Sequence, residues 1–419
     1  MELLSKQLDQ LIIYNKILDD PIVEVVYNLL DSITKQESND ISKKLFIEIH
    51  RLLIVKAENE GLTGNLWKHH LSKIILLDEN PFTLSSELYG NSIGKSIYEI
   101  ATHDLKILKN IYNIDWAELA TKLDIDYLNS IKDYQPTINS NFLDSTSIII
   151  FLDNMDIDHV TKNISDFHYN NGCGIFITHN SFRWDNRILP ILNPDPISFS
   201  DLYGFELQRK TLIKNTKAFL QGKKANNILL VGHRGTGKSS SVKALVNEYH
   251  SEGLRIVEIN KHQLSDYHLI IKALKNRKHK FIIFMDDLSF EDFEVEYKNM
   301  KAIIEGGVEV RPDNVLIYAT SNRRHLIKET WKDREGGDVH AMDSIEEKLS
   351  LSDRFGITIT YNAPNQDKYL EIVKGMASKH NIDIPWEELR QKAIKWELWH
   401  NGRSGRSAQQ FITSLLGEI

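Results

Sequence analysis

NNILLVGHRGTGKSS, at residues 226–240, is the stretch that decides the fold of this chain. Its apolar run Ile228–Val231 leads into Gly232-His233-Arg234-Gly235-Thr236-Gly237-Lys238-Ser239-Ser240, which has the spacing G-x-x-x-x-G-K-S of a phosphate-binding loop. Glycines let consecutive backbone N–H groups turn inward on a phosphate, and the N-terminus of the helix expected from Lys238 onward adds partial positive charge. We expect Lys238 to reach the β- and γ-phosphates of a nucleotide and the Ser239 hydroxyl to ligate Mg²⁺.

Two carboxylates end a second apolar strand, in Phe281-Ile-Ile-Phe-Met-Asp286-Asp287. We expect this strand to lie beside the phosphate loop and to present Asp286 to the metal, because Mg²⁺ keeps several waters and needs only one or two protein ligands. Asp287 is then placed to orient or deprotonate the attacking water. The next apolar strand ends in Ser321-Asn322, and the Asn322 amide is a candidate for holding that water or the γ-phosphate.

Strands and helices alternate around the phosphate loop. Helices are expected at 206–220, 239–249, 266–276 and 293–305, and further strands at 255–259, 281–285, 315–320 and 357–361. This alternation predicts a parallel sheet covered on both faces, with ligands at the carboxyl ends of its strands. From residue 366 onward only helices are expected, at 366–380, 386–398 and 405–416. We therefore predict an α/β core at residues 196–362 and a helical lid at residues 363–419.

Residues 1–195 are predicted to form a separate, mainly helical domain of unknown role. Apolar residues repeat at helical spacing near the N-terminus, and further helices are expected at 42–58, 65–77 and 94–112. Two β-branched runs, Ser147–Leu152 and Gly174–Thr178, predict a short strand-containing part near 146–182. Asn193-Pro194-Asp195-Pro196 marks the boundary with the core. Gly90–Ser96 resembles a phosphate loop but has three residues between its glycines, and we interpret it as a helix start.

Composition restricts the class of protein. A length of 419 residues predicts two or three domains, and 41% hydrophobic with 26% charged residues is ordinary for a soluble protein. No apolar run approaches the roughly 20 residues of a membrane span, and the N-terminus reads as an amphipathic helix instead of a signal peptide. Cys173 is the only cysteine, so no intrachain disulfide can form, and we expect it to be a buried thiol. These features predict a cytoplasmic location and no membrane partner.

The formal net charge of −7 is unevenly distributed. Residues 1–200 hold 17 Lys and Arg against 28 Asp and Glu, whereas residues 201–419 hold 34 against 30. An acidic N-terminal half repels nucleic-acid phosphates, so we favour a protein partner and keep nucleic acid as an alternative. A basic run at Lys272, Lys275, Arg277, Lys278 and Lys280 is interpreted as a solvated helix end, with a nucleic-acid contact as the alternative.

With these motifs in this order, residues from about 200 to 419 resemble an AAA+ ATPase module. The resemblance assigns Gly232–Ser239 to Walker A and Phe281–Asp287 to Walker B, and it implies ATP and Mg²⁺ as ligands. It also implies a sensor role for Asn322, a trans-acting arginine finger at Arg354, a second sensor at Arg406 in the lid, and an adenine-side motif at Leu202, Tyr203 and Gly204. LYGFELQRK (202–210), FMDDLSFE (284–291) and SLSDRFG (350–356) are similar to an uncharacterised bacterial AAA+ family labelled domain of unknown function 815.

The resemblance implies an ATPase that works as a homo-oligomer, with a ring as the usual assembly. Arg323, Arg324 and Arg334 are rivals of Arg354 for the residue that reaches a neighbour's nucleotide. Most AAA+ proteins carry glutamate where this chain has Asp287, which is one methylene shorter, so we expect slow hydrolysis. Two alternatives stay open at this point: a nucleotide-gated scaffold or loader with slow hydrolysis, and a P-loop kinase.

Overall fold

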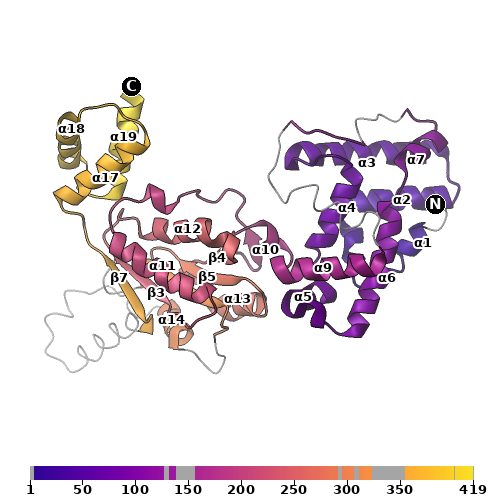
Figure 1. Cartoon of the computed structure of the whole chain (residues 1–419), viewed down its shortest axis with the longest axis horizontal. Helices are drawn as coiled ribbons and strands as arrows, with labels where there is room; N and C mark the ends of the chain where they lie inside the picture. The colour runs from indigo at the N-terminus through magenta and orange to yellow at the C-terminus, as the bar shows by residue number, and fades with distance from the viewer. Residues whose placement is uncertain are drawn as a thin grey trace. The chain divides into compact units, whose positions relative to one another are not determined.

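The computed structural model describes residues 4–126, 132–137, 156–290, 295–305, 311–322, 354–400 and 402–418. The chain divides into two compact units, Met1–Thr178 and His179–Ile419 (Figure 1). The division falls before the boundary that we expected near residue 195, because the first strands after Thr178 pair with the sheet of the second unit. No helix in the described ranges is long and apolar enough to cross a membrane.

The first unit is helical, as predicted. Its helices are α1 (Leu4–Leu8), α2 (Pro21–Thr34), α3 (Asn39–Glu60), α4 (Leu66–Leu77), α5 (Pro81–Tyr89), α6 (Lys95–Tyr112), α7 (Trp116–Lys122), α9 (Ile157–Asn171) and α10 (Ile175–Thr178). Helix α2 begins with Pro21 at its first position, and the Asp20 carboxylate caps it by accepting the Val23 backbone N–H at 3.2 Å. Asp20 also contacts Nε2 of the fully buried His70 at 2.9 Å, which joins α2 to α4.

The prediction of a strand at Gly174–Thr178 is wrong, since this segment forms the one-turn helix α10. Gly172 and Gly174 have φ of 81° and 61°, which reverse the chain on either side of the buried Cys173. The Cys173 thiol donates to the Thr83 carbonyl oxygen at 3.0 Å, and Phe176 is buried beside it. Burial of these side chains outweighs the β propensity of the run. The other predicted strand, Ser147–Leu152, lies outside the described residues.

The stretch that resembles a phosphate loop, Gly90–Ser96, is a helix start, as predicted. Gly90–Ser92 makes one 3₁₀ turn and α6 begins at Lys95. Gly90 has φ of 52°, and a Cβ at this position would lie 2.9 Å from the Tyr169 ring. Glycine is needed here for packing and not for ligand binding.

The second unit contains a seven-stranded sheet in the order β2-β1-β4-β5-β6-β3-β7. Its strands are β1 (Ser181–Trp184), β2 (Ile188–Pro190), β3 (Ile228–Gly232), β4 (Leu254–Glu258), β5 (Lys280–Met285), β6 (Val315–Ser321) and β7 (Ile357–Tyr361). All neighbouring pairs are parallel except the β1–β2 hairpin. We expected the carboxylate strand β5 to lie beside the phosphate loop. In the structure β5 is not adjacent to the phosphate-loop strand β3, because β6 pairs with both of them.

Helices cover this sheet, as the apolar strands predict. They are α11 (Glu206–Leu220), α12 (Lys238–Tyr249), α13 (Tyr267–Leu274) and α14 (Val295–Glu305). Leu212 of α11 and Val242 of α12 pack in one cluster with Ile228, Ile282 and other strand residues, so these two helices share one face. The central strands β3, β5 and β6 are buried along nearly their whole length, which is typical of a parallel sheet with both faces covered.

Residues 191–205 connect hairpin β1–β2 to α11, and we call this segment the strap. It is fastened to α12, because the Asn247 amide donates to the carbonyl oxygens of Asp195 and Ile197 at 2.8 Å. The neighbouring Glu248 carboxylate accepts the Phe199 backbone N–H at 2.9 Å. The strap therefore runs from the edge strand of the sheet to the helix that precedes the phosphate loop.

The C-terminal lid has its own small core. Its helices α17 (Gln366–Lys379), α18 (Trp386–Trp399) and α19 (Gly405–Glu418) form the yellow end of the chain in Figure 1. Tyr369, Val373, Ala393 and Ile412 are fully buried among them. This three-helix lid agrees with the helices expected from the sequence.

Candidate nucleotide-binding site

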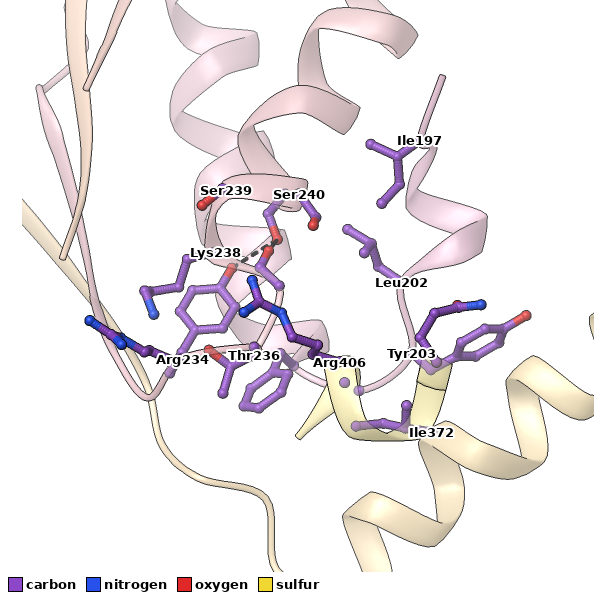
Figure 2. A pocket seen from close by; sticks show the side chains of 18 of the residues that line it. Ile197, Leu202, Tyr203, Arg234, Thr236, Lys238, Ser239, Ser240, Ile372 and Arg406 are labelled. Carbon is purple, nitrogen blue, oxygen red and sulfur yellow. Dashed lines mark hydrogen bonds between the residues drawn. The ribbon is translucent and has the colours of Figure 1, made fainter. Parts of the chain in front are cut away.

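A cavity of about 730 Å³ lies at the carboxyl ends of the strands, between the core and the lid (Figure 2). The phosphate loop supplies polar groups on one side of it, including Lys238, Ser239 and Ser240. Ile197, Leu202, Tyr203 and Ile372 lie on the other side in Figure 2 and give an apolar end. One polar and one apolar end match a ligand that carries phosphates at one end and a flat ring at the other.

The phosphate loop wraps tightly around the end of β3. Gly232 has φ of 137°, and a Cβ there would lie 1.9 Å from the carbonyl oxygen of Tyr361 in β7. His233 donates its backbone N–H to the same oxygen at 3.0 Å. Gly235 and Gly237 have φ of 73° and 85°, which only glycine adopts easily. Three of the sequence-predicted glycines are thus required by backbone geometry.

Lys238 is buried at the start of α12 and makes three hydrogen bonds. Its Nζ donates to the carbonyl oxygens of Gly232 and His233 at 2.9 and 2.7 Å, and to Asn322 Oδ1 at 3.0 Å. Burial lowers the pKa of Lys238 from its usual 10.5 to about 8, against the opposing effect of the Asp287 and Asp286 carboxylates. A ligand that brings negative charge to this amine would favour its protonated form.

Asp286 is positioned by two hydroxyl groups. Its Oδ1 accepts hydrogen bonds from Ser239 Oγ and from Thr320 Oγ1, both at 2.5 Å. The predicted metal pair Ser239 and Asp286 is therefore in direct contact, although these residues come from α12 and the end of β5. A hard cation at this point would meet a hydroxyl and a carboxylate oxygen, which are ligands that Mg²⁺ prefers. The residues present fit the metal that the loop implies.

Asp287 adopts a left-handed backbone conformation, with φ of 51°. Aspartate tolerates this region better than glutamate does, because its short side chain bonds locally. Its backbone N–H donates to Thr320 Oγ1 at 2.9 Å, and its carboxylate accepts from Asn322 Nδ2 at 2.5 Å. Asn322 therefore links Lys238 to Asp287, and the two carboxylates of the predicted pair face different partners.

Sequence reasoning missed Thr320, whose single hydroxyl group donates to the Asp286 carboxylate and accepts the Asp287 backbone N–H. The residue is 1% exposed and lies near the end of β6, directly beside β5. A threonine at the end of a strand is common and gives no signal by itself. Thr320 could have been found only if the pairing of β6 with β5 had been known. Because β6 lies directly beside β5, it brings this hydroxyl to the point where β5 ends and the two aspartates follow.

The lid contacts the phosphate loop directly. The backbone N–H of Arg406, in the first turn of α19, donates to the Gly235 carbonyl oxygen at 3.2 Å. A Cβ at Gly235 would lie 3.0 Å from Ser404 Oγ and from Arg406 Cβ, so the two segments are in close contact. Arg406 lines the cavity, and Figure 2 shows its side chain beside the loop. The structure thus brings the predicted lid arginine to the phosphate side.

One face of α17 packs against the predicted adenine-side motif. A Cβ at Gly375 would lie 2.1 Å from Tyr203 Cδ1, so the tyrosine ring lies flat against the helix backbone. Lys368 pairs with Glu206 at 3.3 Å, and Lys379 pairs with Asp201. Gly204 has φ of 76° and lies against Lys368. Gly375 is a second residue that sequence reasoning missed, because a lone glycine within a helix gives no signal of its partner.

Arg354 is the one predicted site residue that the structure keeps apart from the others. It is exposed, precedes β7, and is not among the described residues that line the cavity. Since β7 is parallel to β3, its first residue and the phosphate loop lie at opposite ends of the strands. The rivals Arg323, Arg324 and Arg334 lie outside the described residues.

The family described as "Protein of unknown function (DUF815)" matches residues 177–419, which is more than half of the chain. The chain belongs to this family. Its parallel sheet and its three C-terminal helices agree with the fold that the resemblance to AAA+ ATPases implies. The match begins close to the point where the second unit begins, so it covers the core and the lid.

The chain is similar to solved structures of the Thermotoga maritima RuvB Holliday junction branch migration motor. The alignment covers 52% of this chain and 72% of the RuvB chain, with 16% sequence identity and a TM-score of 0.34. A variant of the same RuvB matches at 17% identity with the same TM-score. No curated protein matches the sequence.

Proposed function

We propose that this DUF815 protein is an oligomeric ATPase that couples hydrolysis of Mg²⁺-bound ATP to conformational work on a macromolecular partner. The observation that carries the proposal is the chain of contacts from Lys238 through Asn322 to Asp287, at the edge of the same cavity as Ser239 and Asp286. Phosphate recognition, a metal position and a carboxylate for the attacking water therefore come together in one place.

Each of these side chains has a distinct role in the proposed reaction. Ser239 and Asp286 would hold Mg²⁺, which would supply positive charge to offset that of the phosphates. Lys238 and Arg406 bind the γ-phosphate from the core side and the lid side. Asp287 orients the attacking water and accepts its proton, and Asn322 fixes the carboxylate of Asp287. Tyr203 and Gly204 contribute to the base end of the cavity.

Assembly is proposed because Arg354 is far from its own cavity. An arginine supplied in trans stabilises the charge on the transferred phosphoryl group and is worth about 10³–10⁵ in rate. A head-to-tail contact that places this arginine at a neighbour's nucleotide closes into a ring when the rotation allows it. We therefore propose a homo-oligomer, with a ring as its form.

The test is ATP turnover per protomer as a function of protein concentration, for the wild type, Arg354→Ala and the control Arg390→Ala. Arg390 is an exposed arginine of lid helix α18 that pairs only loosely with Glu387, at 3.6 Å. We expect specific activity to rise with concentration in the wild type and the control. Arg354→Ala should bind ATP and stay near the basal rate. Constant activity at all concentrations, with Arg354→Ala equal to wild type, would refute the trans arrangement.

A second candidate function is a nucleotide-gated scaffold or loader, in which ATP binding and assembly are the output and hydrolysis is a slow reset. The observation that favours it is the 2.5 Å contact between Asp287 and Asn322, because a carboxylate held by an amide is not yet directed at water. This candidate is favoured over the first if a non-hydrolysable ATP analogue drives assembly as well as ATP does. Turnover of ATP should then also be slower than disassembly.

The partner is proposed to be a protein, at least for the first unit. Residues 1–178 hold 15 Lys and Arg against 26 Asp and Glu, which repels polyanions. The sequence contains one cysteine, which is buried, so it cannot form an intrachain disulfide. A cytoplasmic location is consistent with this. If ATP turnover is stimulated by a purified protein partner and that stimulation requires residues 1–178, this assignment holds.

A further inference from the structure

A group of cations lies at the edge of the sheet opposite the nucleotide cavity. The loop before β3, residues 221–227, and the loop before β5, taken here as residues 275–280 including the first residue of the strand, together contain six Lys and Arg and no Asp or Glu. We call these two loops the basic edge; its cations are Lys223, Lys224, Lys275, Arg277, Lys278 and Lys280. Because all the core strands are parallel, both loops lie at the amino ends of the strands. Among the described residues, Glu252 and Asp313 also lie at this end of the strands.

The two loops lie close to each other, and both are next to the C-terminal end of helix α11. Strands β3 and β5 are separated only by β6, which places their first residues about 10 Å apart. The Lys280 amine lies over the ring of Phe219, in the last turn of α11, at 5.2 Å from the ring centroid. Lys217 of the same helix lies over Tyr249 at 5.4 Å, and it adds a further exposed cation next to Lys223 and Lys224.

Asparagine side chains hold the basic edge in a fixed conformation. The Asn314 amide donates to the carbonyl oxygens of Leu274 and Arg277 at 2.9 and 3.2 Å, which anchors the loop before β5. Asn215 exchanges two hydrogen bonds with the backbone of Asn226, at 2.8 and 3.1 Å, which anchors the loop before β3. A ligand therefore meets cations on a backbone that is already ordered, and it loses little conformational entropy on binding.

The charge at this edge is strong enough to act on a neighbouring group. His279, in the middle of the second loop, is 5% exposed. Burial first, and then the charges of Arg255, Lys278 and Arg277, lower the pKa of His279 to about 3. A neutral histidine beneath the loop leaves the exposed lysines as the charged surface.

We propose that the basic edge binds the phosphate backbone of duplex nucleic acid without reading its sequence. Phosphate contacts from Lys and Arg give affinity and fix position, whereas sequence is read by groups that enter a groove. Neither loop contains Phe, Tyr or Trp, so the rings on which unpaired bases stack are missing from it. A duplex therefore fits this surface better than a single strand does.

The edge is separate from the nucleotide site, so both ligands can bind at once. The cavity lies at the carboxyl ends of β3, β5 and β6, and the basic edge lies at their amino ends. The acidic residues counted above belong to the first unit, whereas the residues of the basic edge belong to the second. The inference goes beyond the proposed ATPase activity and does not depend on hydrolysis.

The test measures binding of a fluorescein-labelled 30-base-pair DNA of arbitrary sequence by fluorescence anisotropy, from 50 to 200 mM NaCl. Contact with five phosphates predicts a slope of log K against log [salt] near −4.5, and so a loss of affinity of roughly 500-fold over this range. Neutralising the exposed residues in Lys223→Gln/Lys224→Gln/Lys275→Gln/Lys278→Gln should make the slope shallower by about 4 and weaken binding at least 100-fold at 50 mM. A duplex RNA of the same sequence shows which duplex is preferred.

A matched control makes the same change in charge on the first unit. Lys44→Gln/Lys95→Gln/Lys106→Gln/Lys122→Gln also removes four exposed lysines, and it should bind DNA like the wild type. The proposal is overturned if the wild type does not bind DNA at 50 mM NaCl, or if both quadruple variants lose affinity equally. It is also overturned if poly-glutamate competes as well as DNA does, or if neutralising the edge abolishes self-association, which would make it an interface between copies.

Discussion

Binding of ATP should weaken as pH rises from 7 to 9, because the phosphate-loop lysine loses its proton in this range. Burial lowers the pKa of Lys238 in the ligand-free protein to about 8. A triphosphate beside Nζ restores a high pKa, so only the protonated protein binds well. At pH 7 roughly 90% of Lys238 is charged, and at pH 9 roughly 10% is.

These fractions give the magnitude of the effect. The dissociation constant should rise about tenfold between pH 7 and pH 9, which is about 1.4 kcal/mol, and continue to rise about tenfold per pH unit up to the pKa of the bound state. With an unshifted pKa of 10.5, the same interval would change the constant by less than about 10%. The sign follows from linkage: the bound state holds more protons than the free state, so binding is favoured by low pH within this window.

The assay is isothermal titration calorimetry with a non-hydrolysable ATP analogue and Mg²⁺, at half-unit steps of pH. Titration in two buffers of different ionisation enthalpy gives the proton uptake, which should be about 0.9 per site at pH 9 and about 0.1 at pH 7. The control Lys238→Arg keeps its charge over this range, so whatever affinity remains should not vary with pH. A change of less than twofold in the wild type, or no proton uptake at pH 9, would refute the reasoning.

Three further predictions concern single residues of the site. Asp287→Asn keeps a side chain that tolerates the left-handed backbone, so ATP affinity should be unchanged while single-turnover hydrolysis falls about 10²–10⁴-fold; loss of ATP binding would contradict the assigned role. Thr320→Val removes one of the two hydroxyl partners of Asp286 and the acceptor of the Asp287 N–H, and it should lower the free energy of unfolding by about 1–3 kcal/mol in urea titrations, whereas Thr320→Ser should lose about 1 kcal/mol. Gly375→Ala in a helix interior ordinarily stabilises by about 1 kcal/mol, but here its Cβ would displace Tyr203, so the gain should appear only together with Tyr203→Ala. Additive effects of these last two substitutions would show that the ring does not pack on the helix.

The phosphate loop and its neighbours could be predicted from the sequence because their signals are local. The bounds of α11 and β7 agree with the sequence-based ranges, and β6 ends within one residue of the expected position. Spacing of glycines and the run of apolar residues are determined by backbone geometry within a few residues. The polar residues that follow β3, β5 and β6 then meet at one edge, since carboxyl ends of parallel strands share an edge.

Order within the sheet could not be predicted in the same way, because it depends on contacts between distant segments. The segment 181–190 gave no signal that β1 would pair with β4, so the boundary between units was expected too late. The run Ile175–Thr178 has only four residues, so its β propensity does not determine its secondary structure. Burial of Phe176 favours the helix that is found there. Tyr203 against Gly375 likewise depends on how the lid docks, which no local pattern contains.

The strap described above makes the second unit mechanically continuous from one side to the other. It begins at the edge hairpin, is hydrogen-bonded to α12 through Asn247 and Glu248, and near its end contacts lid helix α17 through Asp201 and Tyr203. Rotation of the lid would therefore either break the strap's hydrogen bonds to α12 or displace the hairpin, and it would in that way be coupled to the far edge of the sheet.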